Sequence, residues 1–263
     1  MDYPPQRAFE GERMTDELFS LRVLVVSGSK DDRDQLRHAA AASTVPIEII
    51  EAEDAASACG SLARGVDLVF LDGALGGDAV ARVAAAARAA PKKPFTVLLA
   101  ALQTAAPFET DALAVKPADI EEAKGFVGGA IRVRQPIRVL VVDDSPTMRS
   151  IVRKTLAATR FPLDVTEVAQ GFDAIELART AEFDIVFVDY NMPGFNGLET
   201  IGEFRREKRR VTFVLITSTQ DQALAERARA QGAAFLKKPF FPPDIEAVLG
   251  GFYGLSAVGP KRS

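Results

Sequence analysis

The chain has 263 residues, of which 48% are apolar and 26% charged, and its formal net charge is −4. This length suits two ordinary domains, and the composition excludes a disordered chain. Residues 1–136 hold 15 basic and 20 acidic residues, and residues 137–263 hold 17 and 16, so neither half has the basic excess of a nucleic-acid-binding protein. The single cysteine, Cys59, excludes an intramolecular disulfide framework and a multi-cysteine zinc site.

The apolar runs are short and lie beside charges, so none is long enough to span a bilayer. The N-terminal residues lack the basic-then-apolar layout of a secretion signal. We therefore expect a cytoplasmic protein without membrane insertion.

The first half alternates short apolar runs with helical patterns. Residues 1–20 carry Pro4, Pro5 and several charges, and we expect an N-terminal extension there. Strands are predicted at 21–26, 46–51, 67–72, 95–100 and 113–115. Between the last two, Pro107 leaves room for little more than one turn of helix.

The second half repeats this order. Strands are predicted at 137–143, 163–168, 183–189, 211–217 and 233–238. Ser145 and Pro146 form an N-cap and a first-turn proline, so a helix should start there. Further helices are predicted near 171–181, 197–208, 221–231 and 242–250. Five strands alternating with five helices indicate a parallel sheet that is covered on both faces.

The fold class that follows is α/β, with two doubly wound, flavodoxin-like (βα)5 domains of three layers, each around a parallel five-stranded sheet. The predicted boundaries are an extension at 1–20, a first domain at 21–132, a linker at 133–136, a second domain at 137–252 and a tail at 253–263. The two copies keep an offset of 116 residues from Ser27 to Asp143 and of 117 residues from Asp72 to Asp189.

Polar side chains follow the strands of the second copy at their carboxyl ends, where open parallel sheets bind ligands. These residues are Asp143, Asp144, Asp189, Thr217 and Lys238. Two carboxylates about 4 Å apart repel each other by roughly 4 kcal/mol at an effective dielectric constant near 20. A hard divalent cation such as Mg²⁺ relieves that repulsion, and a carboxylate beside such a metal suits phosphoryl transfer.

The motifs at these strand ends resemble the receiver domain of two-component response regulators, especially the stand-alone chemotaxis type. They are DD at 143–144, FVDYNMPGFNG at 187–197, LITS at 215–218 and KPF at 238–240, within residues 137–252. The resemblance implies that Asp189 accepts a phosphoryl group from a histidine kinase or a histidine phosphotransfer protein. A protein of this kind accepts a phosphoryl group and then dephosphorylates itself, so we do not expect an enzyme.

The resemblance also implies roles for the neighbours of Asp189. Asp144 and Asp189 would bind Mg²⁺ directly, Asn191 through its backbone carbonyl and Asp143 mainly through water, with Mn²⁺ as the alternative ion. Thr217 and Lys238 would bind the phosphoryl group, and a cis peptide is expected before Pro239. Phe235 stands at the position of the family's switch aromatic, without a hydroxyl group.

The first copy lacks most of this set. Asp72 and Lys116 occupy the acceptor and lysine positions, but Ser27 and Gly28 replace the acid pair and Ala100 replaces the hydroxyl. We therefore expect a degenerate pseudo-receiver that is not phosphorylated and that serves interaction or dimerisation. We call the carboxyl edge of each sheet, where these side chains lie, its rim. The disfavoured alternative is that an acid of the first helix reaches the rim of the first copy, and the candidates are Asp31, Asp32 and Asp34.

The leading hypothesis is a two-receiver response regulator without an output domain. Its phosphorylated form would bind an unknown effector protein through the fourth helix and fifth strand of the second copy, and a homodimer is compatible with the sequence. A phosphate sink and a trans-acting regulator of a kinase or cyclase remain alternatives. A metal-dependent phosphohydrolase is disfavoured because there is no general acid two residues after Asp189. The only histidine, His38, is expected to be structural or solvent-facing.

Overall fold

The computed structural model describes residues 20–100, 110–207, 211–219 and 221–257. We call the part from β1 to α4 the first domain. Its elements are β1 (Leu21–Val26), α1 (Lys30–Ala41), β2 (Ile47–Ala52), α2 (Ala55–Leu62), β3 (Leu68–Asp72), the short helix η1 (Gly73–Leu75), α3 (Gly77–Ala89), β4 (Phe95–Ala100), β5 (Ala112–Val115) and α4 (Ile120–Ile131).

We call the part from β6 to α9 the second domain, and the short helix η2 (Arg132–Arg134) leads into it. Its elements are β6 (Ile137–Val142), α5 (Pro146–Ala157), β7 (Leu163–Val168), α6 (Gly171–Thr180), β8 (Ile185–Asp189), α7 (Gly197–Glu207), β9 (Thr212–Thr217), α8 (Gln222–Ala230), β10 (Ala233–Lys237) and α9 (Pro242–Phe252). A last short strand, β11 (Ser256–Ala257), follows α9.

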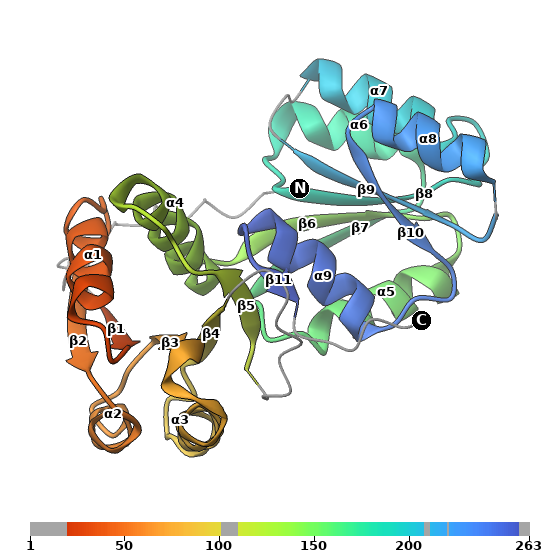
Figure 1. The fold of residues 1–263 in the computed structure, drawn as a ribbon. Coiled ribbons are helices and arrows are strands. Elements are labelled where there is room, and N and C mark those ends of the chain that lie inside the picture. Colours follow the sequence, from red (N-terminus) through yellow and green to blue (C-terminus); the bar gives the residue numbers. More distant parts are fainter. Residues whose placement is uncertain (1–19, 101–109, 208–210, 220, 258–263) are drawn as a thin grey trace, which may run out of the picture.

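Each domain is built around a parallel sheet of five strands, in the orders β5-β4-β3-β1-β2 and β10-β9-β8-β6-β7. In the first domain α1 and α4 cover one face of the sheet and α2 and α3 cover the other (Figure 1). In the second, α5 and α9 lie opposite α6, α7 and α8. The predicted flavodoxin-like fold is confirmed. The expected short fourth helix of the first domain, around Pro107, lies outside the described residues.

The local sequence explains where the rim helices begin. Ser29 and Ser145 are the N-caps of α1 and α5, and their hydroxyls accept hydrogen bonds from Asp32 N and Met148 N, both at 3.3 Å. Pro146 fills the first turn of α5, where no backbone N–H is needed. Both helices therefore start just beyond the carboxyl end of the first strand of their sheet.

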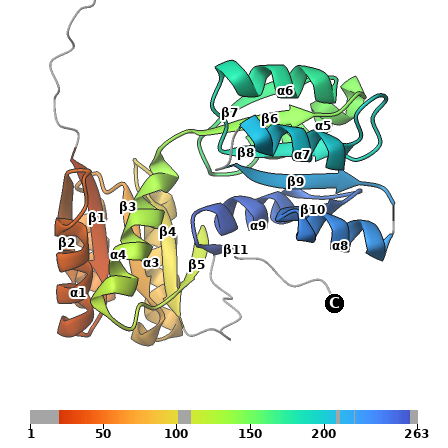
Figure 2. The same cartoon turned by 90° about the horizontal axis from the view of Figure 1, so that it is seen from above.

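The first sheet has a sixth strand that the sequence did not predict. β11 pairs with β5 in antiparallel register, with Leu113 opposite Ser256, so the end of the second domain extends the sheet of the first. Figure 2 shows β5 and β11 side by side between the domains. The segment predicted as a C-terminal tail at 253–263 thus contains a strand of the first sheet.

One of the apolar clusters crosses from domain to domain. It joins the α1–α4 side of the first sheet to the α5–α9 side of the second. The Phe161 ring lies 5.3 Å from that of Phe95, in the first domain, and stacks on Tyr253 at 5.4 Å. Asp111 of the first domain forms an ion pair with Arg160 of the second. The domains therefore share a buried contact.

A like-charge pair within this contact yields a prediction. Burial, and then the carboxylate of Asp111, raise the pKa of Glu246 on α9 above its ordinary value of 4.5. A raised carboxyl pKa means stability that is complete below pH 4.5 and is lost as the pH rises through the folded-state value. Glu246→Gln should therefore raise the free energy of unfolding at pH 7, by about 0.5 kcal/mol given solvent screening, and have no effect near pH 3.

Urea unfolding followed by circular dichroism at the two pH values checks this result. Glu226→Gln, on the exposed face of α8, is the matched control and should leave the free energy of unfolding unchanged at both. An equal effect of both substitutions at pH 7 would contradict the repulsion between Glu246 and Asp111.

Within the described residues, no helix combines the length and apolar character needed to cross a bilayer.

Candidate functional site

The predicted rim residues of the second domain meet around one ammonium group. Lys238 Nζ lies 2.6 Å from Asp189 Oδ1 and 3.1 Å from Asp143 Oδ2. Both carboxylates are almost completely buried, at 5% exposure for Asp189 and 2% for Asp143. The strand ends of β6 and β8 and the loop after β10 thus bring together three of the predicted residues, and the lysine links the two acids.

The remaining carboxylate oxygens are bound by the backbone. Asn191 N donates to Asp189 Oδ2 at 2.8 Å, and Ser145 N donates to Asp143 Oδ1 at 2.9 Å. These bonds fix the orientation of both acids, because every carboxylate oxygen of the pair has a partner. The backbone N–H of Asn191 acts here, whereas its side chain is exposed.

The third predicted acid is arranged differently. Asp144 is exposed and forms no hydrogen bond or ion pair with the described residues. Accordingly, the described part of the chain contains no group of three His, Cys, Asp or Glu side chains gathered to hold a metal ion. The structure places Asp143 and Asp189 together and leaves Asp144 at the edge, free to turn.

Burial shifts the protonation equilibria of this cluster. Burial raises the pKa of Asp143, the Asp189 carboxylate adds to this, and the hydrogen bonds from Ser145 and Lys238 only partly oppose it. Burial alone would lower the pKa of Lys238, but its hydrogen bonds to Asp189 and Asp143 outweigh this, so its pKa is raised. The lysine is therefore a permanent cation at neutral pH.

Two further predicted residues lie on the neighbouring strands. Thr217 ends β9, is fully buried, and accepts a hydrogen bond from Thr219 N at 3.0 Å. Phe235 lies on β10 opposite Leu215 and is partly buried against the α6–α8 side of the core. The expected cis peptide between Lys238 and Pro239 is present. The switching role of Phe235 stays a prediction.

Sequence reasoning missed an arginine that supports the rim. Arg149 of α5 donates to the backbone carbonyl of Asp143 at 2.7 Å and lies 3.5 Å from the Glu167 carboxylate on β7. Arg33 makes the same pair of contacts in the first domain, to the carbonyl of Ser27 and to Glu51. The signal was available, because Arg33 and Arg149 differ by the same 116 residues as Ser27 and Asp143.

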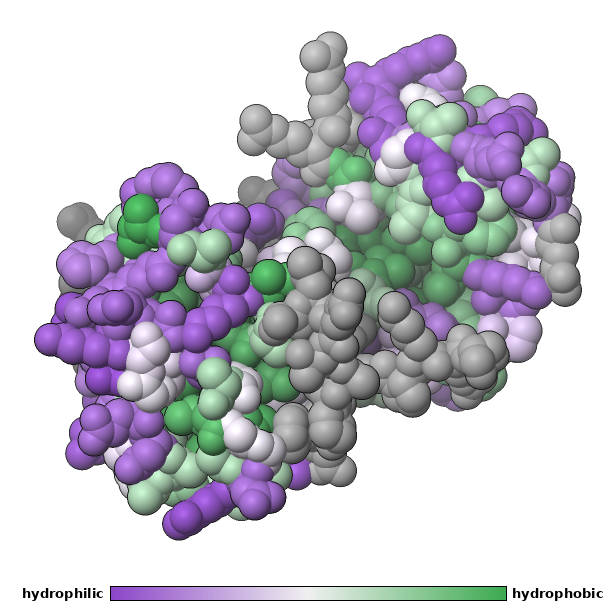
Figure 3. Space-filling model, in the orientation of Figure 1, coloured by the Kyte–Doolittle hydropathy of each residue, from purple (hydrophilic) through white to green (hydrophobic). Residues whose placement is uncertain are grey.

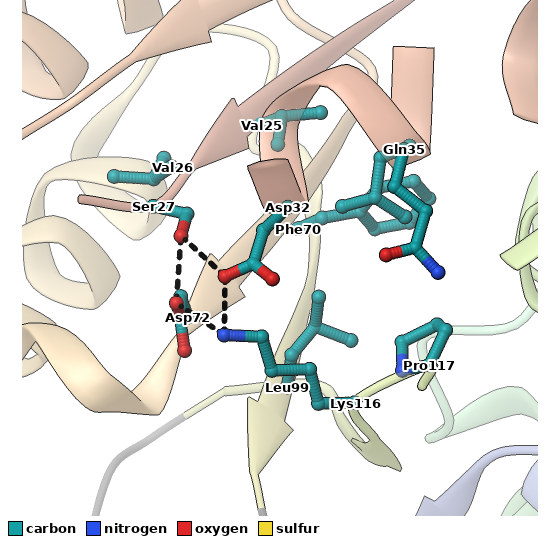
Figure 4. Close-up of a pocket in the computed structure, with 11 residues that line it drawn as sticks. Val25, Val26, Ser27, Asp32, Gln35, Phe70, Asp72, Leu99, Lys116 and Pro117 are labelled. Atoms are coloured by element: carbon teal, nitrogen blue, oxygen red, sulfur yellow. Dashed lines mark hydrogen bonds and ion pairs between the residues drawn. The ribbon is translucent and has the colours of Figure 1, made fainter. Parts of the chain in front are cut away.

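The first domain has a counterpart of this cluster (Figure 4). Lys116 Nζ lies 3.0 Å from Asp72 Oδ2 and forms a second ion pair with Asp32. Ser27 donates to Asp72 at 2.7 Å and contacts Asp32 at 3.2 Å. The expectation that no acid of the first helix reaches the rim is therefore wrong: Asp32 of α1 takes the place that Asp143 has in the second domain.

This counterpart is closed. Asp72 is 3% exposed, and its other oxygen accepts a hydrogen bond from Ala74 N at 3.0 Å. The cavity beside it has a volume of about 10 Å³, room for about one water molecule. Burial raises the pKa of Asp72, but the hydrogen bonds from Ser27, Ala74 and Lys116 together outweigh it, so the pKa lies below its ordinary value. The acid is ionised and fully partnered.

The residue left without a role is exposed as expected: His38 lies on the solvent side of α1, with Nδ1 2.7 Å from the carbonyl oxygen of Asp34.

Comparisons with known proteins agree with this geometry. Residues 139–249 match the response regulator receiver domain family. The chain is 35% identical over 122 residues to the chemotaxis protein CheY1 of Helicobacter pylori, a match covering 43% of this chain and 98% of that protein. It is 32% identical over 115 residues to the nitrate/nitrite response regulator NarL of Escherichia coli, covering 43% of this chain and 52% of NarL, so it spans about half the length of that relative.

A solved structure extends the similarity to both domains. It is described as a probable two-component system response regulator/GGDEF domain protein, and the match covers 89% of this chain and 98% of that chain. The TM-score is 0.56 and the sequence identity 23%, so this similarity shows the fold. Two receiver-like domains in tandem therefore occur in another chain as well.

Proposed function

The chain belongs to the response regulator receiver family, and we propose that its second domain is the switch of a two-component system, with Asp189 as the phosphoryl acceptor. The observation that carries the proposal is the cluster of Asp189, Asp143 and Lys238 at the carboxyl ends of a parallel sheet. The donor would be a phosphohistidine of a histidine kinase or phosphotransfer protein. The protein would act in the cytoplasm and accept the group rather than turn over a substrate.

In this proposal the side chains divide the work. An Asp189 oxygen attacks phosphorus, a P–O bond forms, and the bond from phosphorus to the donor breaks. The Lys238 ammonium forms an ion pair with the transferred phosphoryl group, and the Thr217 hydroxyl donates a hydrogen bond to the same group. Since Asp143 and Asp189 are held by neighbouring backbone N–H groups, the nucleophile is already oriented before the donor arrives.

The donor set also fits Mg²⁺, which binds oxygen ligands and retains several waters. The Lys238 ammonium already bridges two of the carboxylates, so the rim attracts a cation. Asp144 and Asp189, with the Asn191 carbonyl, would hold the ion, and Asp143 would do so through water. When bound, the ion neutralises charge on the phosphoryl oxygens. Asp144, without a partner among the described residues, is available to turn inward.

We propose that the first domain is a degenerate receiver that is not phosphorylated. Two differences from the second domain support this: Ser27, at the position of Asp143, donates a further hydrogen bond to Asp72, and Asp32 of α1 also binds Lys116. Ala100 supplies no hydroxyl group at the strand end where the second domain has Thr217.

Labelling with a small phosphodonor in the presence of Mg²⁺ tests both proposals. We expect one phosphoryl group per chain that alkali and hydroxylamine remove, its loss in Asp189→Asn, and unchanged labelling in Asp72→Asn. Removing Mg²⁺ with a chelator should abolish labelling of the wild type. Labelling that survives in Asp189→Asn and disappears in Asp72→Asn would reverse the assignment of the two domains.

A further inference from the structure

Helix α9 connects the rim of the second domain to the contact between the domains. Lys238, which bridges the two acids, precedes α9 by four residues, and the buried Phe240 lies between them. At its other end the helix stops at Phe252, and Tyr253 follows in the contact. Figure 1 shows α9 on the side of the second domain that faces the first. The helix is therefore a physical connection between the two places.

The far end of α9 is packed as closely as backbone atoms allow. A Cβ atom added to Gly129 of α4 would lie only 2.5 Å from the carbonyl oxygen of Tyr253. The Tyr253 ring stacks on Phe161, with 13° between the ring planes, and the guanidinium carbon of Arg132 lies 5.1 Å from the centre of the Phe252 ring. Figure 3 shows apolar surface in the hollow between the two lobes. A shift of α9 cannot be absorbed here without separating the surfaces.

The near end of α9 depends on the state of Asp189. Lys238 Nζ is shared between Asp189 and Asp143, and its backbone N–H donates to the Thr217 carbonyl at 2.8 Å. A phosphoryl group on Asp189 adds negative charge next to Nζ and gives the ammonium a new partner. Lys238 must then change its contacts, and the chain that leads into α9 moves with it.

The contact also contains two features that weaken it. The Tyr253 hydroxyl is buried without a hydrogen-bond partner among the described residues. Burial and the Asp111 carboxylate both disfavour the ionised form of Glu246 in this contact, and Asp111 has Arg160 as its counter-ion. The packed arrangement is thus held by apolar surface and opposed by the unpartnered Tyr253 hydroxyl and by the repulsion between Glu246 and Asp111, so a modest displacement of α9 can open it.

We propose that the first domain is an intramolecular cover for α9, and that phosphorylation of Asp189 loosens this cover and frees the α9 surface. This proposal rests on the proposed function of Asp189. In this proposal the first domain acts through the surface that packs on α9, and its own cluster of Asp72, Lys116 and Asp32 takes no part. In the structure with this contact, Lys238 binds both acids.

Substitutions of two glycines in α4 test the proposal. Gly129→Ala should separate the domains, because its Cβ meets backbone. Gly128→Ala is the matched control, since a Cβ there meets nothing within 4 Å. In the full chain without phosphodonor, hydrogen exchange of the last turn of α9 should be faster in Gly129→Ala and unchanged in Gly128→Ala. Equal exchange in the two variants would overturn the cover.

Linkage then requires a reciprocal effect at the rim. Beryllofluoride with Mg²⁺ is the probe of the phosphorylated state, and Gly129→Ala should bind it about fivefold more tightly than the wild type, with Gly128→Ala unchanged. Arg160→Ala, which removes the ion pair with Asp111, is a second variant and should act in the same direction as Gly129→Ala. Unchanged affinity in variants with separated domains would overturn the coupling. A wild type that binds no beryllofluoride would overturn the proposed function as well, so the two failures are distinguishable.

Discussion

Replacing Lys238 with methionine is expected to lower the rate of Asp189 phosphorylation about 100-fold or more and, at the same time, to tighten Mg²⁺ binding. The rate falls because the ammonium 2.6 Å from Asp189 Oδ1 no longer neutralises charge on the transferred group. Metal binding tightens because the same ammonium competes with a cation for Asp189 and Asp143. A residue that merely supported the rim would change both quantities in the same direction.

The same substitution should reduce stability in the absence of metal. It leaves two buried carboxylates facing each other without their counter-charge, and breaking a buried ion pair in this way costs about 3 kcal/mol. Mg²⁺ should restore most of this loss. Initial labelling rates, calorimetric Mg²⁺ titration and urea unfolding measure the three effects. Lys237→Met, at an exposed neighbour, is the control and should leave all three unchanged. Weaker Mg²⁺ binding in Lys238→Met would contradict the competition.

The strand ends of the second domain could be predicted from the sequence because each obeys a local rule. Continuous apolar runs become buried central strands, and a polar residue directly after such a run has to lie at the carboxyl edge of the sheet. Asp143, Asp189 and Thr217 follow this rule, and the structure places them at that edge. The contact of Lys238 with both acids follows from the strand order β10-β9-β8-β6, which brings its loop to the same edge.

Asp32 shows where the rule stops. It lies in the first turn of α1, behind the N-cap Ser29, and not at a strand end. Side chains of a helix lean toward its N-terminus, and the N-terminus of α1 lies at the rim. An acid in that turn can therefore reach the strand ends from outside the sheet. From the sequence this reach was a disfavoured alternative, because Ser27 and Gly28 replace the acid pair at the strand end and no local pattern selects Asp32 over Asp31 or Asp34.

The contact between the domains could not be predicted for a different reason. Phe161 and Tyr253 lie outside any periodic pattern, and β11 has only two residues, too few to show alternation. Their positions depend on how two separate sheets meet, which local propensity does not encode. The repeated arginines, which lie outside this contact, were predictable in principle, since Arg33 and Arg149 each follow the residue whose carbonyl they bind by six positions in the sequence.

Replacing Gly197 with alanine is expected to destabilise the protein by about 2–3 kcal/mol and to slow phosphorylation of Asp189 about 100-fold. Gly197 begins α7, and its N–H donates to the Tyr190 carbonyl at 3.1 Å. A Cβ there would lie 2.6 Å from the carbonyl oxygen of Asp189 and 2.9 Å from Cα of Tyr190. Both atoms belong to the backbone that carries the nucleophile, so relief of the clash moves Asp189 itself.

Gly202→Ala, in the same helix, should have the opposite effect on stability. A Cβ at Gly202 meets nothing within 4 Å, so alanine adds only its higher helix propensity, about 1 kcal/mol of stability, and leaves labelling unchanged. At Gly197 the new methyl group meets the backbone of Asp189 and Tyr190 and the side chain of Leu215, whereas at Gly202 it meets nothing within 4 Å. Urea unfolding and initial labelling rates separate them. If both variants gained stability and labelled like the wild type, the close packing of α7 on β8 would not position the nucleophile.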